Sequence, residues 1–92
     1  MNLEDHIDSE KISTVLFLKE SCEHCGEVFR LLKSVVKTFR IPLYIVWLEN
    51  NGNLFDKYSV QLVPTCIVFR EGRVYDILEG LGSEDEYRSL ML

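Results

Sequence analysis

The sequence predicts an α/β domain: a mixed four-stranded sheet with helices on both faces. Residues 13–19 and 43–48 are short apolar runs that enclose a helical pattern, which indicates a right-handed parallel strand–helix–strand unit. Residues 66–70 and 73–79 are further strand-like runs, and the two-residue link Glu71-Gly72 is typical of an antiparallel hairpin. The length of 92 residues suits a single domain, residues 1–92.

The first half of the chain alternates between buried strands and a long amphipathic helix. Residues 13–19 (STVLFLK) are predicted as a strand buried on both faces. From Glu23 onward the apolar spacing becomes helical, and one face carries Val28, Leu31, Leu32, Val35, Val36 and Phe39. Ile41-Pro42 ends this helix, because the residue before a proline favours extended geometry. Residues 43–48 are predicted as a second buried strand.

Three shorter helices complete the prediction. Residues 49–53 (ENNGN) have turn chemistry, with Asn51 or Asn53 available to cap a short helix that runs through Tyr58. Ser83 and Glu86 form a capping box that begins a last helix. We also expect a short helix within residues 1–12, with Leu3 and Ile7 as its apolar contacts.

Composition excludes several classes of protein. With 47% apolar and 27% charged residues, the chain is typical of a soluble globular protein. Its longest apolar run, residues 41–48, is far shorter than the roughly 20 residues that span a bilayer. The net charge of −5 and the absence of a basic cluster predict no nucleic-acid or membrane partner. The acidic opening MNLEDHIDSE lacks the features of a secretory signal, so we expect a cytoplasmic location.

Cys22 and Cys25 occupy the junction between the first strand and the long helix. A helix N-terminus presents unpaired N–H groups and a partial positive charge, which lower the pKa of a nearby thiol. We therefore expect Cys22 to be the nucleophile and Cys25 the resolving thiol of a redox pair. Between them, a protonated His24 would favour the Cys22 thiolate and Glu23 would oppose it, so no reduction potential is predicted.

Two longer stretches resemble the thioredoxin family. They are TVLFLKESCEHC and DKYSVQLVPTCIVFREGRVYDILEGLGS, and the resemblance covers roughly residues 13–92. Val63-Pro64-Thr65 stands where the family has a cis-proline beside its active site, and Gly72 and Gly80 match family glycines of the hairpin and of the segment after it.

The resemblance implies a thioredoxin-like fold and a set of roles for individual residues. Pro64 would be cis, would pack against the Cys22–Cys25 pair and would help to keep metals off the thiols. The backbone of Val63 would pair with an extended substrate segment, and Thr65 and Gly80 would complete the substrate-binding surface.

The chain also departs from the family pattern. Ser21 replaces a usual tryptophan, Leu16 replaces a buried aspartate that moves the proton of the resolving thiol, and Arg30 replaces a proline. The middle pair Glu23-His24 replaces Gly-Pro, and a histidine at this place resembles the more oxidising or isomerase-like relatives. These differences predict a specialised member of the thioredoxin/glutaredoxin superfamily.

Other interpretations of the cysteines stay open at this point. The pair could be two buried core residues, or could bind a metal with Cys66, His24 or His6, although His24 lies between the cysteines and cannot easily join them on one ion. A cluster shared between two chains is a further alternative. Cys66 is predicted as a core residue and His6 as solvent-facing in a frayed N-terminus. Trp47 and Tyr44 are predicted as core residues.

The favoured hypothesis is a protein-disulfide oxidoreductase that acts in cell redox homeostasis and needs no bound cofactor. Its expected partners are a protein disulfide substrate and a reductase, and the expected state is a monomer. A non-catalytic thioredoxin-fold module, which docks a partner peptide near Val63 and Pro64, is the main alternative.

Overall fold

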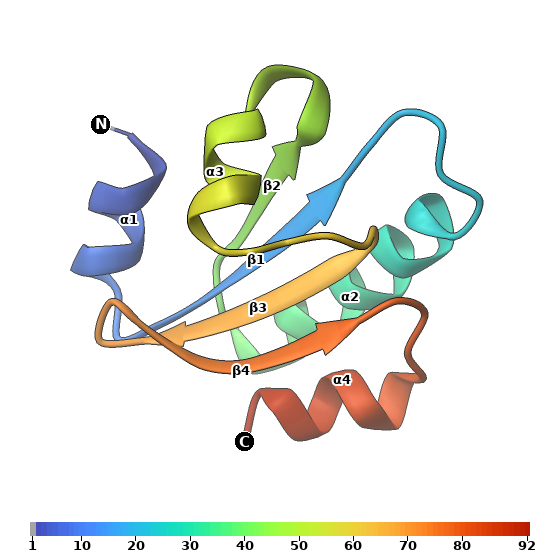
Figure 1. The fold of residues 1–92 in the computed structure, drawn as a ribbon. Helices are drawn as coiled ribbons and strands as arrows, with labels where there is room; N and C mark the ends of the chain where they lie inside the picture. Colours follow the sequence, from blue (N-terminus) through green and yellow to red (C-terminus); the bar gives the residue numbers. More distant parts are fainter. Residues whose placement is uncertain (1) are drawn as a thin grey trace.

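The computed structural model describes residues 2–92, which form one four-stranded sheet and four α-helices (Figure 1). In chain order the elements are α1 (Leu3–Ser9), β1 (Ile12–Leu18), α2 (Cys25–Phe39), β2 (Leu43–Trp47), a 3₁₀ turn (Leu48–Asn50), α3 (Gly52–Lys57), β3 (Thr65–Arg70), β4 (Arg73–Glu79) and α4 (Glu84–Leu90).

The sheet is mixed, as the sequence predicts. The strand order is β2-β1-β3-β4, with β1 parallel to β2 and antiparallel to β3, and with β3 antiparallel to β4. The β3–β4 turn uses Glu71 and Gly72, whose φ angles of 52° and 78° suit the left-handed geometry of a tight hairpin. A side chain at position 72 would meet the Asp8 carboxylate, since an added Cβ lies 2.7 Å from its Oδ1.

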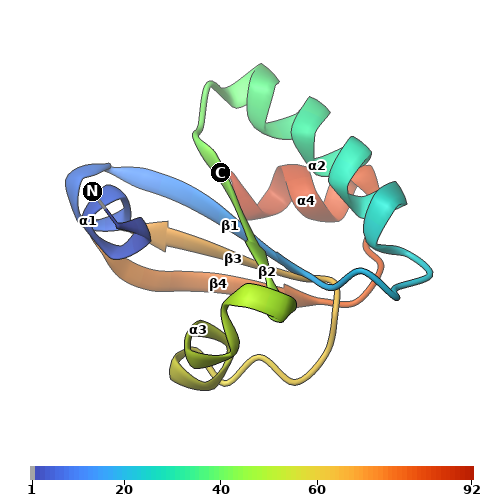
Figure 2. The same cartoon turned by 90° about the horizontal axis from the view of Figure 1, so that it is seen from above.

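Helices cover both faces of the sheet, which confirms the predicted layering (Figure 2). One core cluster joins Leu16 and Leu18 of β1 to α2 and α4. The opposite cluster joins Val15 and Phe17 of β1 to Ile7 of α1 and to α3. Successive β1 side chains therefore alternate between two buried layers, as expected of a central strand.

The prediction for β2 was wrong in one respect, because β2 is an edge strand and pairs only with β1. Its side chains are consequently less buried than those of β1, and Trp47 is 42% exposed. Tyr44 is half-buried and contacts the ring of His6, with ring centroids 5.3 Å apart. His6 therefore lies within α1 against β2, and its predicted place in a frayed, solvent-facing terminus was wrong.

The shorter helices form where the sequence predicts them, with one different cap. Asn51 is the N-cap of α3, yet its side chain donates to the carbonyl oxygen of Trp47 and makes no capping bond. Ser83 and Glu86 form the predicted capping box of α4, with both reciprocal hydrogen bonds present. Among residues 2–92, no helix has the length and apolar character needed to cross a membrane.

Candidate active site

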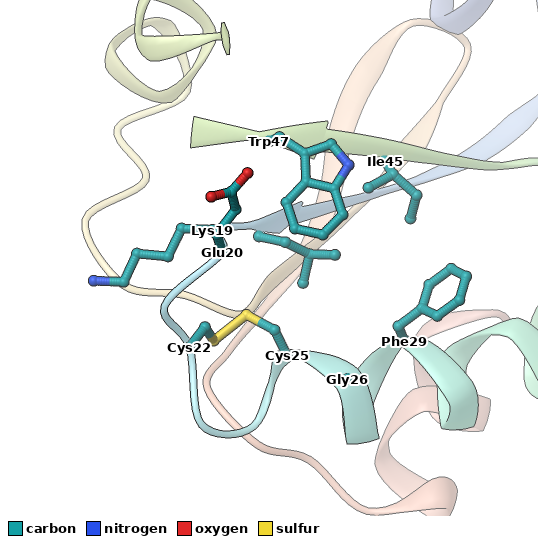
Figure 3. Close-up of a pocket in the computed structure, with 9 residues that line it drawn as sticks. Lys19, Glu20, Cys22, Cys25, Gly26, Phe29, Ile45 and Trp47 are labelled. Carbon is teal, nitrogen blue, oxygen red and sulfur yellow. A yellow bond between two sulfur atoms is a disulfide. The ribbon is translucent and has the colours of Figure 1, made fainter. Parts of the chain in front are cut away.

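Cys22 and Cys25 are joined by a disulfide at the C-terminal end of β1, where the chain turns into α2 (Figure 3). Their Cα atoms lie 5.5 Å apart. Cys25, the first residue of α2, is only 5% exposed and packs in the core cluster, whereas Cys22 is partly exposed. The Cys22 sulfur is therefore the one within reach of another molecule, which fits the predicted order of nucleophile and resolving thiol.

The start of α2 provides the positive end of a helix beside Cys22. Cys25 is the first residue of α2 and His24 is its N-cap, with a backbone carbonyl that accepts from Val28 N–H at 3.0 Å. The His24 side chain makes no capping hydrogen bond, so the first N–H groups of α2 remain oriented toward the loop that holds Cys22. This arrangement favours a thiolate at Cys22. Glu23 and His24 are both exposed.

The loop before β3 contains a cis peptide bond between Val63 and Pro64. Pro64 is buried, and its carbonyl oxygen accepts a 2.7 Å hydrogen bond from the N–H of Gly80. Gly80 has φ +79°, a left-handed conformation that glycine adopts at little cost. The hairpin end at Gly80 therefore fixes the loop that carries Pro64.

Cys22 and Val63 line one groove of about 340 Å³, together with Glu23 and His24. Among residues 2–92, the N–H and C=O groups of Val63 take part in no backbone hydrogen bond. An extended peptide placed along this groove would therefore find one donor and one acceptor at Val63. The sequence-predicted residues Cys22, Glu23, His24 and Val63 thus come together on one surface.

Thr65 occupies a different position in the site. Its side chain is 2% exposed, and its hydroxyl donates to the carbonyl oxygen of Leu62 at 2.5 Å. Thr65 therefore holds the turn around Pro64 through its side chain. A contact between Thr65 or Gly80 and a substrate remains a prediction.

The interior next to Cys25 is apolar. Leu16 is fully buried in the same cluster as Cys25 and Cys66, and it pairs with Ile45 on one side and Cys66 on the other. Burial, with a smaller contribution from the charge of Asp76, raises the pKa of the Cys66 thiol to about 12. Cys66 is thus the core residue that the sequence predicts, and no carboxylate stands at position 16 to take a proton from Cys25.

Trp47 is the residue of the site that sequence reasoning missed, since it was predicted as core. It lines a cavity of about 570 Å³ with Cys22, Cys25 and Phe29 (Figure 3). Trp47 ends β2 and is in register with Leu18, which ends β1. Because parallel strands end at the same edge of a sheet, the last residue of β2 lies beside whatever follows β1. That topological signal could have found Trp47.

Within residues 2–92, no group of three or more His, Cys, Asp or Glu side chains is placed to hold a metal ion. Structural zinc in proteins takes four such ligands.

A family model described as Thioredoxin matches residues 1–91. The chain belongs to the thioredoxin family. The curated protein Thioredoxin Y2, chloroplastic, from Arabidopsis thaliana is 29% identical over 75 residues, which cover 79% of this chain and 45% of that protein. The chain thus spans less than half the length of this curated relative.

Solved thioredoxin structures share the fold. A mutant thioredoxin from Halobacterium salinarum superposes with a TM-score of 0.90 at 21% identity, covering 97% of this chain and 79% of that one. The reduced desulfothioredoxin from Desulfovibrio vulgaris Hildenborough gives a TM-score of 0.83 at 22% identity, covering 98% of this chain and 88% of that one. The oxidised thioredoxin from Plasmodium falciparum gives a TM-score of 0.82 at 21% identity, covering 96% of this chain and 85% of that one. These likenesses establish the thioredoxin fold of the chain.

Proposed function

We propose that the chain is a thiol–disulfide oxidoreductase that exchanges a Cys22–Cys25 dithiol/disulfide with protein substrates. The observation that carries the proposal is the placement of a partly exposed Cys22 at the N-terminus of α2, bonded to a buried Cys25 and lining a groove with Val63. The groove suits an extended polypeptide because Val63 leaves its N–H and C=O groups without backbone partners within residues 2–92.

In the proposed cycle the reduced protein begins as a Cys22 thiolate and a Cys25 thiol. The Cys22 sulfur attacks one sulfur of the substrate disulfide, the substrate S–S bond breaks, and the departing substrate thiolate takes a proton from water. Cys25 then passes its proton to water and its thiolate attacks the Cys22 sulfur. The bond between Cys22 and the substrate breaks, and the second substrate thiolate leaves and takes a proton from water. The protein is left with a Cys22–Cys25 disulfide, and the substrate has gained two electrons and two protons.

A separate reductase must return two electrons to the Cys22–Cys25 disulfide after each turnover. We propose a monomer that works with such a reductase in the cytoplasm, where thiol systems keep proteins reduced. The chain itself supplies the two sulfurs and the binding groove, and the chemistry needs no bound cofactor.

Cysteine variants assayed on a disulfide-bonded protein, with dithiothreitol as the electron source, test the proposal. We expect Cys22→Ser to abolish turnover. Cys25→Ser, reduced and then freed of dithiothreitol before it meets the substrate, should accumulate a mixed disulfide with the substrate that is detectable by mass spectrometry. Cys66→Ser serves as the matched control, since Cys66 is 1% exposed and lies outside the groove. Full turnover by Cys22→Ser contradicts the mechanism. Substrate binding without any disulfide exchange by the unaltered protein would favour a docking module instead.

A further inference from the structure

A second hollow beside the disulfide is the cavity between β2 and the start of α2 (Figure 3). Trp47 and Ile45 extend into it from β2, and the disulfide and Phe29 close it from the other side. Its volume of about 570 Å³ falls within the roughly 300–1,000 Å³ of ligand pockets. It shares only Cys22 and Lys19 with the groove that contains Val63, so the two hollows adjoin the reactive sulfur separately.

The walls of the cavity select an apolar occupant. Leu18, Phe29, Ile45 and Trp47 supply most of the lining, and the charged side chains Lys19 and Glu20 belong to the rim. A charged side chain that entered deeply would lose its hydration against these apolar walls, which is unfavourable. An apolar side chain would instead release water from the exposed face of Trp47 and from its own surface.

We propose that this cavity receives a large apolar side chain of the substrate protein, carried by a residue within about three positions of the substrate's reactive cysteine. The inference rests on the proposed function and names the class of substrate that the site prefers: disulfides flanked by residues such as Phe, Leu or Met. The cavity adds a second contact region to the groove beside Val63.

The tether provided by Cys22 explains why the occupant comes from the substrate. Once Cys22 is bonded to the substrate cysteine, the neighbouring residues of the substrate are held next to a cavity that Cys22 itself lines. An extended chain advances about 3.3 Å per residue, so a side chain two or three positions away lies about 7–10 Å from the mixed disulfide. Tethering raises the effective concentration of that side chain, so modest apolar burial is enough to fill the cavity.

Synthetic peptides test the proposal in the Cys25→Ser background, which stops the reaction at the mixed disulfide. Each peptide carries one cysteine linked to thionitrobenzoate, and Phe or Gly is placed in turn at each of three positions on either side. The Cys22 thiolate attacks the peptide sulfur and releases the coloured thionitrobenzoate anion, which gives the rate directly. We expect Phe on one side of the cysteine to raise the second-order rate constant about tenfold over Gly.

Variants of the cavity wall identify where the Phe side chain binds. Trp47→Ala should reduce the ratio of the rate constants for the Phe and Gly peptides to below about threefold. Trp47→Phe should keep most of the original ratio, because an aromatic side chain still forms the cavity wall. Tyr75→Ala is the matched control: Tyr75 is an aromatic residue 54% exposed on β4, outside the cavity, and its loss should leave the ratio unchanged.

Fluorescence provides a readout that a purely structural role of Trp47 would not give. Trp47 is the only tryptophan of the chain, so its emission reports on the cavity alone. We expect a blue shift when the Phe peptide is bonded to Cys22 and none with the Gly peptide.

Two outcomes would overturn the inference while leaving the proposed function intact. One is equal rates for the Phe and Gly peptides in a protein that attacks both. The other is a dimer in sedimentation that Trp47→Ala converts to a monomer, because a second copy would then be the occupant. Failure of the reduced protein to attack even 2-hydroxyethyl disulfide would instead contradict the proposed function itself.

Discussion

The backbone N–H of Gly80 donates a 2.7 Å hydrogen bond to the carbonyl oxygen of Pro64. Gly80 follows β4 and Pro64 directly precedes β3, so this bond ties the outer strand of the hairpin to the loop beside Cys22. The hydroxyl of Tyr87, on α4, donates to the Gly80 carbonyl at 3.4 Å. Gly80 therefore connects the site to both the hairpin and the C-terminal helix.

Replacing Gly80 tests this connection. At φ +79° an alanine suffers backbone strain of about 1–2 kcal/mol, although its Cβ would find only ordinary contact with Leu62 at 3.8 Å. We expect Gly80→Ala to lower the free energy of unfolding by about that amount and to slow disulfide exchange, because the Pro64 loop shifts. Urea unfolding and the peptide assay measure the two effects.

Gly52→Ala is the control for this substitution. Gly52 begins α3, and a Cβ added there meets nothing within 4 Å. Its change in stability should stay within about 0.5 kcal/mol. Equal stability of the Gly80→Ala and Gly52→Ala variants would contradict the backbone strain expected at position 80, and an unchanged rate of disulfide exchange in Gly80→Ala would contradict the link from Gly80 to the Pro64 loop.

Leu16 lies in the same apolar cluster as Cys25, which must lose its proton in the second step of the proposed cycle. Placing a carboxylate there by Leu16→Asp should speed the second step of exchange, since the new group can accept that proton. Stability should fall by several kcal/mol because a polar group enters an apolar cluster. Single-turnover measurement of the lifetime of the mixed disulfide near pH 7 follows the first effect. Leu16→Asn has a similar shape and no titrating proton, so equal lifetimes in the two variants would refute the explanation.

Local sequence patterns were sufficient to predict most elements of this fold. The helical spacing from Val28 to Val36 specifies the buried face of α2, and Glu71-Gly72 specifies the hairpin. The position of the Cys22–Cys25 pair was also predictable, because both residues lie between a strand and the first turn of a helix whatever the order of strands in the sheet.

Features that depend on the order of the strands were not predictable from local patterns. β2 is as apolar as a central strand, yet it lies at the edge of the sheet, so Trp47 is available to the site. The contact of His6 with Tyr44 likewise requires α1 to pack beside β2, which no local pattern encodes. Long-range packing decided these positions, and they include the cavity proposed as a subsite.

The capping box of α4 should contribute measurably to stability. Ser83 accepts from the Glu86 N–H at 3.2 Å, and the Glu86 side chain accepts from the Ser83 N–H at 2.9 Å. Ser83→Ala removes the first bond and should cost about 1 kcal/mol, or about 4–8 °C in Tm for a domain of this size. Ser89→Ala, an exposed change later in the same helix, should leave Tm nearly constant. A similar fall in Tm in both variants would mean that the capping box makes no specific contribution to stability.

Cys66 should be inert to alkylation in the folded, reduced protein. Burial raises the pKa of its thiol from about 9 to about 12, so at pH 8 the reactive thiolate is scarcer by about three orders of magnitude than in a free cysteine. We expect iodoacetamide to modify Cys22 first and to reach Cys66 only after unfolding, as counted by mass spectrometry. Rapid modification of Cys66 under native conditions would contradict its placement in the core.

The same raised pKa predicts a loss of stability in alkaline solution. Above about pH 9 the unfolded chain releases the Cys66 proton while the folded chain retains it, so the unfolded state is favoured increasingly until about pH 12. Urea midpoints between pH 8 and pH 11 should therefore fall more steeply for the unaltered protein than for Cys66→Ala, with both proteins kept in the same redox state. The smaller alanine side chain lowers stability by an amount that does not change with pH, so the slopes of urea midpoint against pH can be compared directly. Equal slopes for the two proteins would show that Cys66 does not govern the alkaline transition.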